Sequence, residues 1–131
     1  MDVQHQILTI AGWNMRSLNS AGPYMHELSS AKKADIICVA EHRLYENELN
    51  KLNDLELEYD FIAKSSTDLK NYDQSRQAGH CGLAIFWRKS WNPRICSVIS
   101  NSDRICAIEI LKAYGSLSLF YYWCLPSSPK M

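Results

Sequence analysis

The chain has 131 residues, enough for one domain, and its 47% hydrophobic and 21% charged residues are ordinary for a globular protein. Its 14 lysines and arginines balance 14 acidic residues, so the net charge is zero, which excludes the overall basic excess usual in proteins that bind the nucleic-acid backbone. Because the N-terminus lacks the basic start and apolar stretch of a signal peptide, and no apolar run approaches the roughly 20 residues that span a membrane, we expect an intracellular protein, nuclear or cytoplasmic.

The first half of the chain alternates expected strands with expected helices. The run at residues 36–40 is apolar throughout, as in a strand that is buried on both faces. The leucines at 49, 52 and 55 lie at helical spacing with charges between them. In chain order we expect a strand at 7–12, a helix from Pro23 to Lys33, a strand at 36–40, a helix at 46–58, a strand at 59–63 and a polar loop at 64–80.

The second half is dominated by β patterns. Four runs rich in β-branched and aromatic residues are separated by turn residues, at 83–87, 95–99, 105–111 and 117–123. The order of strand, helix, strand, helix and then several strands predicts an α/β fold: a mixed sheet with helices on one face, in a single domain that covers residues 1–131.

The cysteines are not expected to be paired. They are five in number, which is odd, and no two have CxxC spacing, so neither a disulfide framework nor a zinc site is indicated. Several lie inside apolar runs, where a free cysteine behaves as a small hydrophobic residue. We therefore expect a reduced protein with free thiols at Cys38, Cys81, Cys96, Cys106 and Cys124.

Asn14 and Glu41 are the first candidates for chemistry, because each comes just after an expected strand. A helix joins the two strands, so they should be parallel and should bring both residues to the same sheet edge, where ligands of open α/β sheets bind. A carboxylate there can hold Mg²⁺, and an amide beside it can contact a phosphate. The alternative is that Glu41 is a solvated loop residue and Asn14 a turn residue.

Five weak motifs in the right order resemble the endonuclease/exonuclease/phosphatase family. They are LTIAGWNMRSLN, ADIICVAEHRL, GHCGLAIFWRKSW, SDRICAIEI and GSLSLFYYWCLPSS, and together they extend from residue 7 to residue 128. The pieces EHRL and SDRI look more like the endonucleases of LINE-type retrotransposons, which accompany a reverse transcriptase, than like DNA-repair or inositol-phosphate members.

The resemblance implies a metal-dependent endonuclease that hydrolyses DNA phosphodiesters with Mg²⁺ or Mn²⁺. Glu41 matches the family's metal-binding glutamate, and Asn14 matches the asparagine that helps to order the metal and phosphate. The family fold is a four-layer α/β/β/α sandwich, of which the chain is expected to supply about half, namely the first sheet and its helices. His42 and Arg104 are weaker candidates for substrate contacts, because His42 could equally be a surface residue and Arg104 could pair with a nearby acid.

The chain departs from the family pattern in two respects. Cys124 stands where the family has the tyrosine of a Tyr-x-Pro motif, and a thiol cannot reproduce the reach of a phenol. The downstream Gly-Asp-x-Asn and Ser-Asp-His motifs have no counterpart among the 131 residues, so we expect a C-terminally truncated domain that is inactive as this chain. The alternatives are a non-enzymatic remnant, a domain that binds a partner or itself over an open sheet face, and a phosphatase or phosphodiesterase of the same fold.

Overall fold

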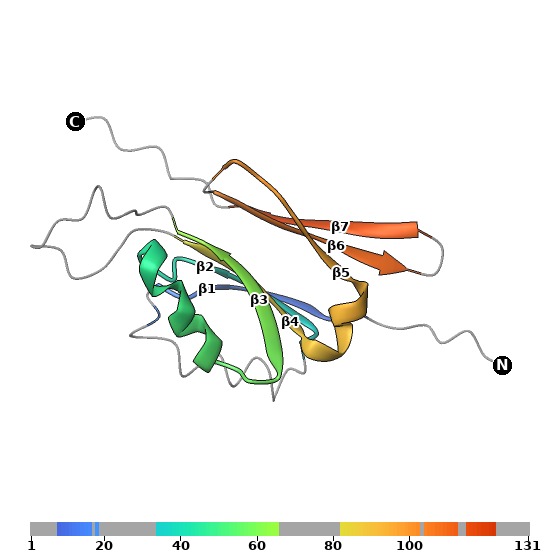
Figure 1. Ribbon diagram of the computed structural model, residues 1–131, viewed down its shortest axis with the longest axis horizontal. Helices are drawn as coiled ribbons and strands as arrows, with labels where there is room; N and C mark the ends of the chain where they lie inside the picture. The colour runs from blue at the N-terminus through green and yellow to red at the C-terminus, as the bar shows by residue number, and fades with distance from the viewer. Residues whose placement is uncertain are drawn as a thin grey trace, which may run out of the picture.

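Two β-sheets packed face to face form the centre of the molecule, with a 3-10 helix on the outer side of one of them (Figure 1). The computed structural model describes residues 8–16, 18, 34–65, 82–102, 104–112 and 115–122. Two 3-10 helices lie within the described residues, η2 (Glu46–Asp54) and η4 (Lys89–Arg94). Among the described residues, no helix has the length and apolar content needed to cross a membrane.

The first sheet is mixed and has four strands in the order β1-β2-β4-β3. β1 and β2 are parallel, whereas β4 is antiparallel to both β2 and β3. The strands span Ile10–Asn14 (β1), Ile36–Ala40 (β2), Tyr59–Lys64 (β3) and Leu83–Arg88 (β4). The expected mixed sheet with helical structure on one face is therefore confirmed.

The second sheet is a three-stranded antiparallel meander in the order β5-β6-β7. Its strands span Ile95–Val98 (β5), Ile105–Lys112 (β6) and Gly115–Tyr122 (β7). The chain is expected to supply approximately the first sheet and its helices; it also supplies these strands, which form a separate sheet that packs on the first. The η4 turn between β4 and β5 carries the chain from one sheet to the other.

Strand alternation explains the two cores. Successive side chains of a strand point to opposite faces, so a strand that is apolar at every position contributes to two layers. In β2, Ile37 and Val39 enter the core under η2, whereas Ile36 and Cys38 enter the core between the sheets. β4 divides in the same way, and the second sheet closes the inner core with Cys106, Ile108 and Ile110.

The expected helix at 46–58 is a 3-10 helix that ends at Asp54. Three leucines are spaced by three residues, which is the repeat of a 3-10 helix, where side chains at i and i+3 eclipse. They all pack on the core under the helix, with Leu52 fully buried and Leu49 and Leu55 partly buried. At the start of η2, the Tyr45 backbone N–H donates to Glu48 Oε1 (3.0 Å), which satisfies one backbone donor.

The observed strand boundaries agree closely with the expected ones, except for the first strand. That strand is expected at 7–12 and found at Ile10–Asn14. All five residues of β1 pair in register with the five residues of β2, so pairing with the buried strand carries Trp13 and Asn14 into the ladder. The expected helix from Pro23 to Lys33 lies outside the described residues, as does all but the beginning of the expected loop at 64–80.

Candidate functional site

Four strand ends line up at one edge of the first sheet. β1, β2 and β3 have their pairing positions there at Asn14, Ala40 and Lys64, and the partner in β4 is Leu83. Because β1 and β2 are parallel neighbours, the residues at and beyond their carboxyl ends emerge together. We call this row of four residues the site edge.

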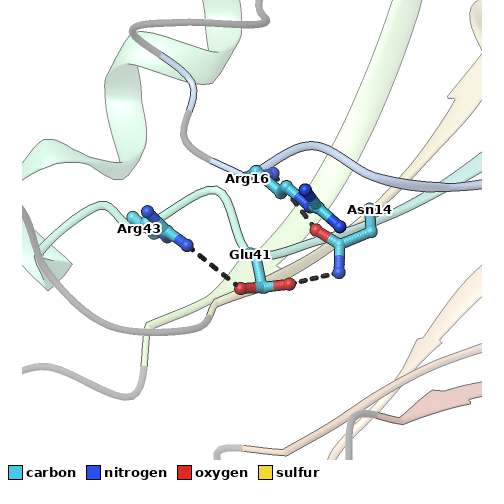
Figure 2. Close-up of polar contacts among 4 residues, drawn as sticks. All are labelled: Asn14, Arg16, Glu41 and Arg43. Carbon is cyan, nitrogen blue, oxygen red and sulfur yellow. Dashed lines mark hydrogen bonds and ion pairs between the residues drawn. The ribbon is translucent and has the colours of Figure 1, made fainter.

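Asn14 and Glu41 lie side by side at the site edge, as the sequence predicts. The Asn14 amide Nδ2 donates to Glu41 Oε2, and the Arg16 backbone N–H donates to Asn14 Oδ1 (3.1 Å). Figure 2 shows the amide between these two partners. Since one end of the amide donates and the other accepts, both contacts require the same orientation of Asn14. The asparagine therefore holds the carboxylate of Glu41 in a defined position.

The turn after β2 has an uncommon backbone. Glu41 and Arg43 have φ of 60° and 58°, in the left-handed region that residues other than glycine seldom adopt. Arg16, after β1, has φ of 53°, and within the described chain these are the non-glycine residues with positive φ. Their concentration at one edge fits the observation that backbone strain gathers at functional sites. The Glu41 backbone N–H donates to the carbonyl of Gly82 (2.7 Å), which ties the turn to the start of β4.

His42 anchors this turn from beneath. It has no exposed surface, and its Nδ1 accepts the Leu44 backbone N–H (3.0 Å). The other ring nitrogen, Nε2, must then carry the proton and donate to the carbonyl of Lys64 (2.9 Å). Burial lowers the pKa of His42 and favours this neutral form. Both ring nitrogens are engaged by backbone groups, so His42 is not the surface residue considered above, and in this arrangement it positions the turn and offers no group to a substrate.

Gly82 makes room for the His42 ring. Its φ is +100°, and a Cβ built on it would lie 2.2 Å from His42 Cε1. No side chain fits there, so a glycine at this position is required both by the backbone conformation and by the close approach of the ring.

Arg43 pairs with the carboxylate of Glu41. Its Nη2 lies 3.3 Å from Glu41 Oε1, the oxygen that Asn14 leaves free (Figure 2). The Arg43 side chain is 40% exposed, and that of Glu41 is 19% exposed. The carboxylate thus has an amide donor on one oxygen and a cation on the other.

The second sheet reaches the site edge through the β5–β6 turn. Lys64 Nζ donates to the carbonyls of Ser100 (2.5 Å) and Ser102 (2.8 Å), so one ammonium group ties the end of β3 to this turn. Arg104 follows the turn; its backbone N–H donates to Ser102 Oγ (3.2 Å), and the residue is exposed. Its role in substrate binding stays a prediction.

Cys124 lies outside the described residues, and its proposed place in the site stays a prediction. The last described strand, β7, ends close to this edge. β7 ends at Tyr122, which pairs with Ile105, and the neighbouring Cys106 Sγ–H donates to the carbonyl of Leu83 (3.8 Å).

The donor set at the site edge fits a single Mg²⁺ held largely by water and substrate. Glu41 supplies one carboxylate, and Mg²⁺ usually binds through one or two carboxylates plus phosphate and several waters. Among the described residues, no group of three His, Cys, Asp or Glu side chains gathers to make a closed metal cage. Because Asn14 donates through Nδ2 to Glu41, the amide would influence a bound ion through the carboxylate.

Sequence reasoning missed four residues that shape this edge. Arg43 stands inside the EHRL motif, but its contact with Glu41 depends on the left-handed backbone. Lys64 and Arg16 gave no pattern that distinguished them from ordinary surface cations. The one available signal was Gly82, a glycine directly before a buried strand, which often marks a close approach of another group.

No protein-family model and no curated protein matches the sequence. Solved structures do match the fold. AP endonuclease LMAP from Leishmania major has a TM-score of 0.68 at 13% identity, over 90% of this chain and 40% of that one. The 3′ phosphatase NExo from Neisseria, bound to product DNA hairpin, has a TM-score of 0.56 at 16% identity, over 79% of this chain and 38% of that one. The endonuclease domain of TRAS1, a telomere-specific non-LTR retrotransposon, has a TM-score of 0.55 at 12% identity, over 93% of this chain and 48% of that one.

These structures share the endonuclease/exonuclease/phosphatase fold, and the chain spans less than half of the length of each. The described chain thus has the fold of the endonuclease/exonuclease/phosphatase structures, with its Asn14–Glu41 pair at the carboxyl ends of two parallel strands.

Proposed function

We propose that this chain carries the metal-binding edge of a Mg²⁺-dependent DNA endonuclease domain of the LINE retrotransposon type, with Mn²⁺ as an alternative ion. The observation that carries the proposal is the contact between Asn14 Nδ2 and Glu41 Oε2 at the ends of parallel strands. A carboxylate held by an amide at this edge is a prepared ligand for a hard cation.

Each residue at the edge has a distinct part in the proposal. Glu41 holds the ion, and Asn14 fixes the carboxylate so that it does not have to reorganise when the ion arrives. When bound, the ion supplies stabilisation of negative charge on the phosphodiester oxygens. Arg104, exposed beside the β5–β6 turn, is proposed to contact a phosphate, and Cys124 to stand near the scissile bond in place of a tyrosine.

DNA is the proposed partner. The solved structures of the same fold include an AP endonuclease and a 3′ phosphatase bound to a DNA hairpin. Exposed or half-exposed arginines lie around the site edge, at Arg16, Arg43 and Arg104. The net charge of the whole chain is zero, so this local patch must supply the attraction, and DNA binding should be weak and sensitive to salt.

The metal proposal is tested by titrating Mn²⁺ and following the free-ion signal by electron paramagnetic resonance. The wild-type chain should bind one Mn²⁺ weakly, and Mg²⁺ should compete for it. Glu41→Gln keeps the size of the side chain and removes its charge, so binding should be lost while the thermal melt is retained. Equal Mn²⁺ binding by the wild-type chain and by Glu41→Gln would refute the proposal.

We further propose that this chain alone binds metal but does not nick DNA. Hydrolysis needs a positioned water, a metal and charge stabilisation together, and the 131 residues contain neither Gly-Asp-x-Asn nor Ser-Asp-His. Loss of several members of a catalytic unit leaves little rate. Supercoiled plasmid with Mg²⁺ or Mn²⁺ is the assay. Metal-dependent nicking by the wild-type chain that disappears in Glu41→Ala would contradict this part of the proposal and would still support the metal site.

A phosphatase acting on DNA ends is the second candidate, favoured by the structural match to the Neisseria 3′ phosphatase. It predicts release of inorganic phosphate from a 3′-phosphorylated oligonucleotide without cleavage of internal bonds. The two candidates are separated by incubating one labelled duplex with a 3′-phosphate and resolving the products by length.

A further inference from the structure

We infer that Arg43 occupies the place of the metal ion at Glu41 when no ion is bound, and moves to a DNA phosphate when the ion arrives. The inference rests on the proposed function, because it assumes that Glu41 is the metal ligand. Its starting point is the ion pair between Arg43 Nη2 and Glu41 Oε1, at 3.3 Å. In this reading Arg43 is a substrate-binding residue whose availability is controlled by the metal.

The backbone conformation of the turn brings the Glu41 carboxylate and the Arg43 guanidinium together. Glu41 and Arg43 both have left-handed φ, and the residue between them, His42, is fully buried. The His42 side chain is buried, and the carboxylate of Glu41 and the guanidinium of Arg43 point toward each other (Figure 2). Ordinary exposed ion pairs need no strained backbone. Two left-handed residues around one anchored histidine indicate that this pair has a defined geometry.

The contacts of Glu41 leave one carboxylate oxygen for a cation, and Arg43 occupies it. Oε2 already accepts from Asn14 Nδ2, so Oε1, the oxygen that Arg43 contacts, is the one without an amide donor and the one that we assign to an incoming ion. Two cations at that oxygen repel each other, and this repulsion favours displacement of the guanidinium when the ion binds. The side chain of Arg43 is 40% exposed.

A phosphodiester is the ligand that the displaced guanidinium suits. Arginine presents planar paired donors that match phosphate oxygens, and it stays charged at every relevant pH. A phosphate that contacts the ion at Glu41 also lies within the reach of a side chain that has just left Glu41. Metal binding therefore exchanges an internal ion pair for a free phosphate-binding group, so metal and DNA should each tighten the binding of the other.

The first experiment compares the affinity for Mn²⁺ of three variants by electron paramagnetic resonance. Arg43→Gly removes the competing cation and suits the left-handed backbone, so Mn²⁺ should bind about two- to fivefold more tightly, as expected for loss of an exposed ion pair. Arg43→Lys restores the charge and should return the affinity toward wild type. Arg16→Gly is the matched control, since it removes a nearby left-handed arginine that lies on Asn14 and not on Glu41. It should change the affinity clearly less.

The second experiment measures the binding of a short fluorescent duplex by anisotropy, with and without Mn²⁺. The ratio of the two dissociation constants gives the coupling between metal and DNA. In Arg43→Gly this coupling should fall about two- to fivefold, because the released guanidinium is missing. Arg16→Gly should keep the wild-type coupling even where its overall DNA affinity falls.

The outcomes separate this inference from the proposed function. If Glu41→Gln still binds Mn²⁺ like wild type, or if no variant binds it at millimolar concentration, the metal site itself is refuted and the inference with it. If Glu41→Gln loses Mn²⁺ while Arg43→Gly and Arg16→Gly give equal affinities or equal couplings, the metal site stands and the role of Arg43 is overturned. Thermal melts of all variants confirm that each is folded.

Discussion

At the scale of single residues, the site depends on one histidine that contacts no ligand. His42 satisfies the backbone of Leu44 and Lys64 with its two ring nitrogens, and so joins the turn after β2 to the end of β3. Its burial fixes the residues on either side of it, Glu41 and Arg43. A buried, fully bonded polar side chain specifies one arrangement, because any other leaves its groups unpaired.

The close approach of Gly82 to His42 gives the first prediction. Gly82→Ala places a Cβ 2.2 Å from the ring and forces alanine to a φ of +100°, so we expect a loss of about 2 kcal/mol or more in the free energy of unfolding. Urea denaturation followed by tryptophan fluorescence measures it. Gly12→Ala is the control, because a Cβ at Gly12 meets no atom within 4 Å, and it should change stability by less than about 0.5 kcal/mol. Similar losses in both variants would contradict the packing of His42 against Gly82.

The sequence predicts the Asn14–Glu41 pair because that pair follows from topology alone. Two strands joined by a helix are parallel, and their carboxyl ends share an edge. The ion pair with Arg43 and the burial of His42 follow from a left-handed backbone and from a glycine forty residues later in the chain. Such contacts depend on how distant segments pack, and neither spacing nor residue type in one sequence reveals them.

At the scale of the elements, the boundaries that the sequence predicts best belong to the most buried strand. β2 is found at the expected residues 36–40, because a run of five apolar residues with both faces covered permits no other boundary. β1 shifts by several residues because its limits are set by pairing with β2 and not by its own pattern. The leucines of η2 predict a helix, but their spacing of three selects the 3-10 form.

Leu52 should account for much of the attachment of η2 to the sheet. Its side chain is 1% exposed in the core under the helix, so Leu52→Ala removes buried methyl groups and leaves a cavity. We expect a loss of about 2–4 kcal/mol in the free energy of unfolding. Leu57→Ala, at a residue that is 72% exposed, should stay within about 0.5 kcal/mol of wild type. Chemical denaturation of the two variants side by side is the measurement, and equal stabilities would show that η2 does not pack as described.

At the scale of the whole molecule, the contact between the two sheets is open to a chemical test. Cys38 of the first sheet and Cys106 of the second are both buried in the core between them, whereas Cys96 is exposed. Burial, with a smaller contribution from its neighbour Cys106, raises the pKa of Cys38 to about 12, and burial raises that of Cys106 to about 11. At pH 8 both stay protonated and shielded, and the thiolate is the reactive form.

Iodoacetamide labelling followed by peptide mass spectrometry should therefore modify Cys96 well before Cys38 or Cys106. Denaturant should remove the difference, which serves as the control. Labelling of Cys38 in the native protein as fast as Cys96 would mean that the two sheets do not stay packed.

Edge strands give the last prediction. Within the described residues, β1 is hydrogen-bonded on one side only and carries Ile10, which is 43% exposed. Exposed edges and apolar residues promote association, so we expect the chain to self-associate as its concentration rises. Ile10→Lys should shift sedimentation toward the monomer, and Leu57→Lys, which removes an exposed leucine that lies outside the strands, should shift it clearly less. A wild-type chain that remains monomeric across the range would contradict this expectation.

The burial of both faces of β2 affects how its pairing register is determined. Sliding a strand by one residue normally exposes its apolar side to water, and that penalty keeps the alignment correct. In β2 such a slip would merely exchange two apolar sets that are both enclosed, so the penalty is small. The discriminating contacts lie at its end, where Glu41 bonds the carbonyl of Gly82 and His42 bonds that of Lys64. The polar turn that is proposed to bind the metal thus also fixes the register of the central strand. Substitutions that break its hydrogen bonds should first shift the pairing of β2 with its neighbours.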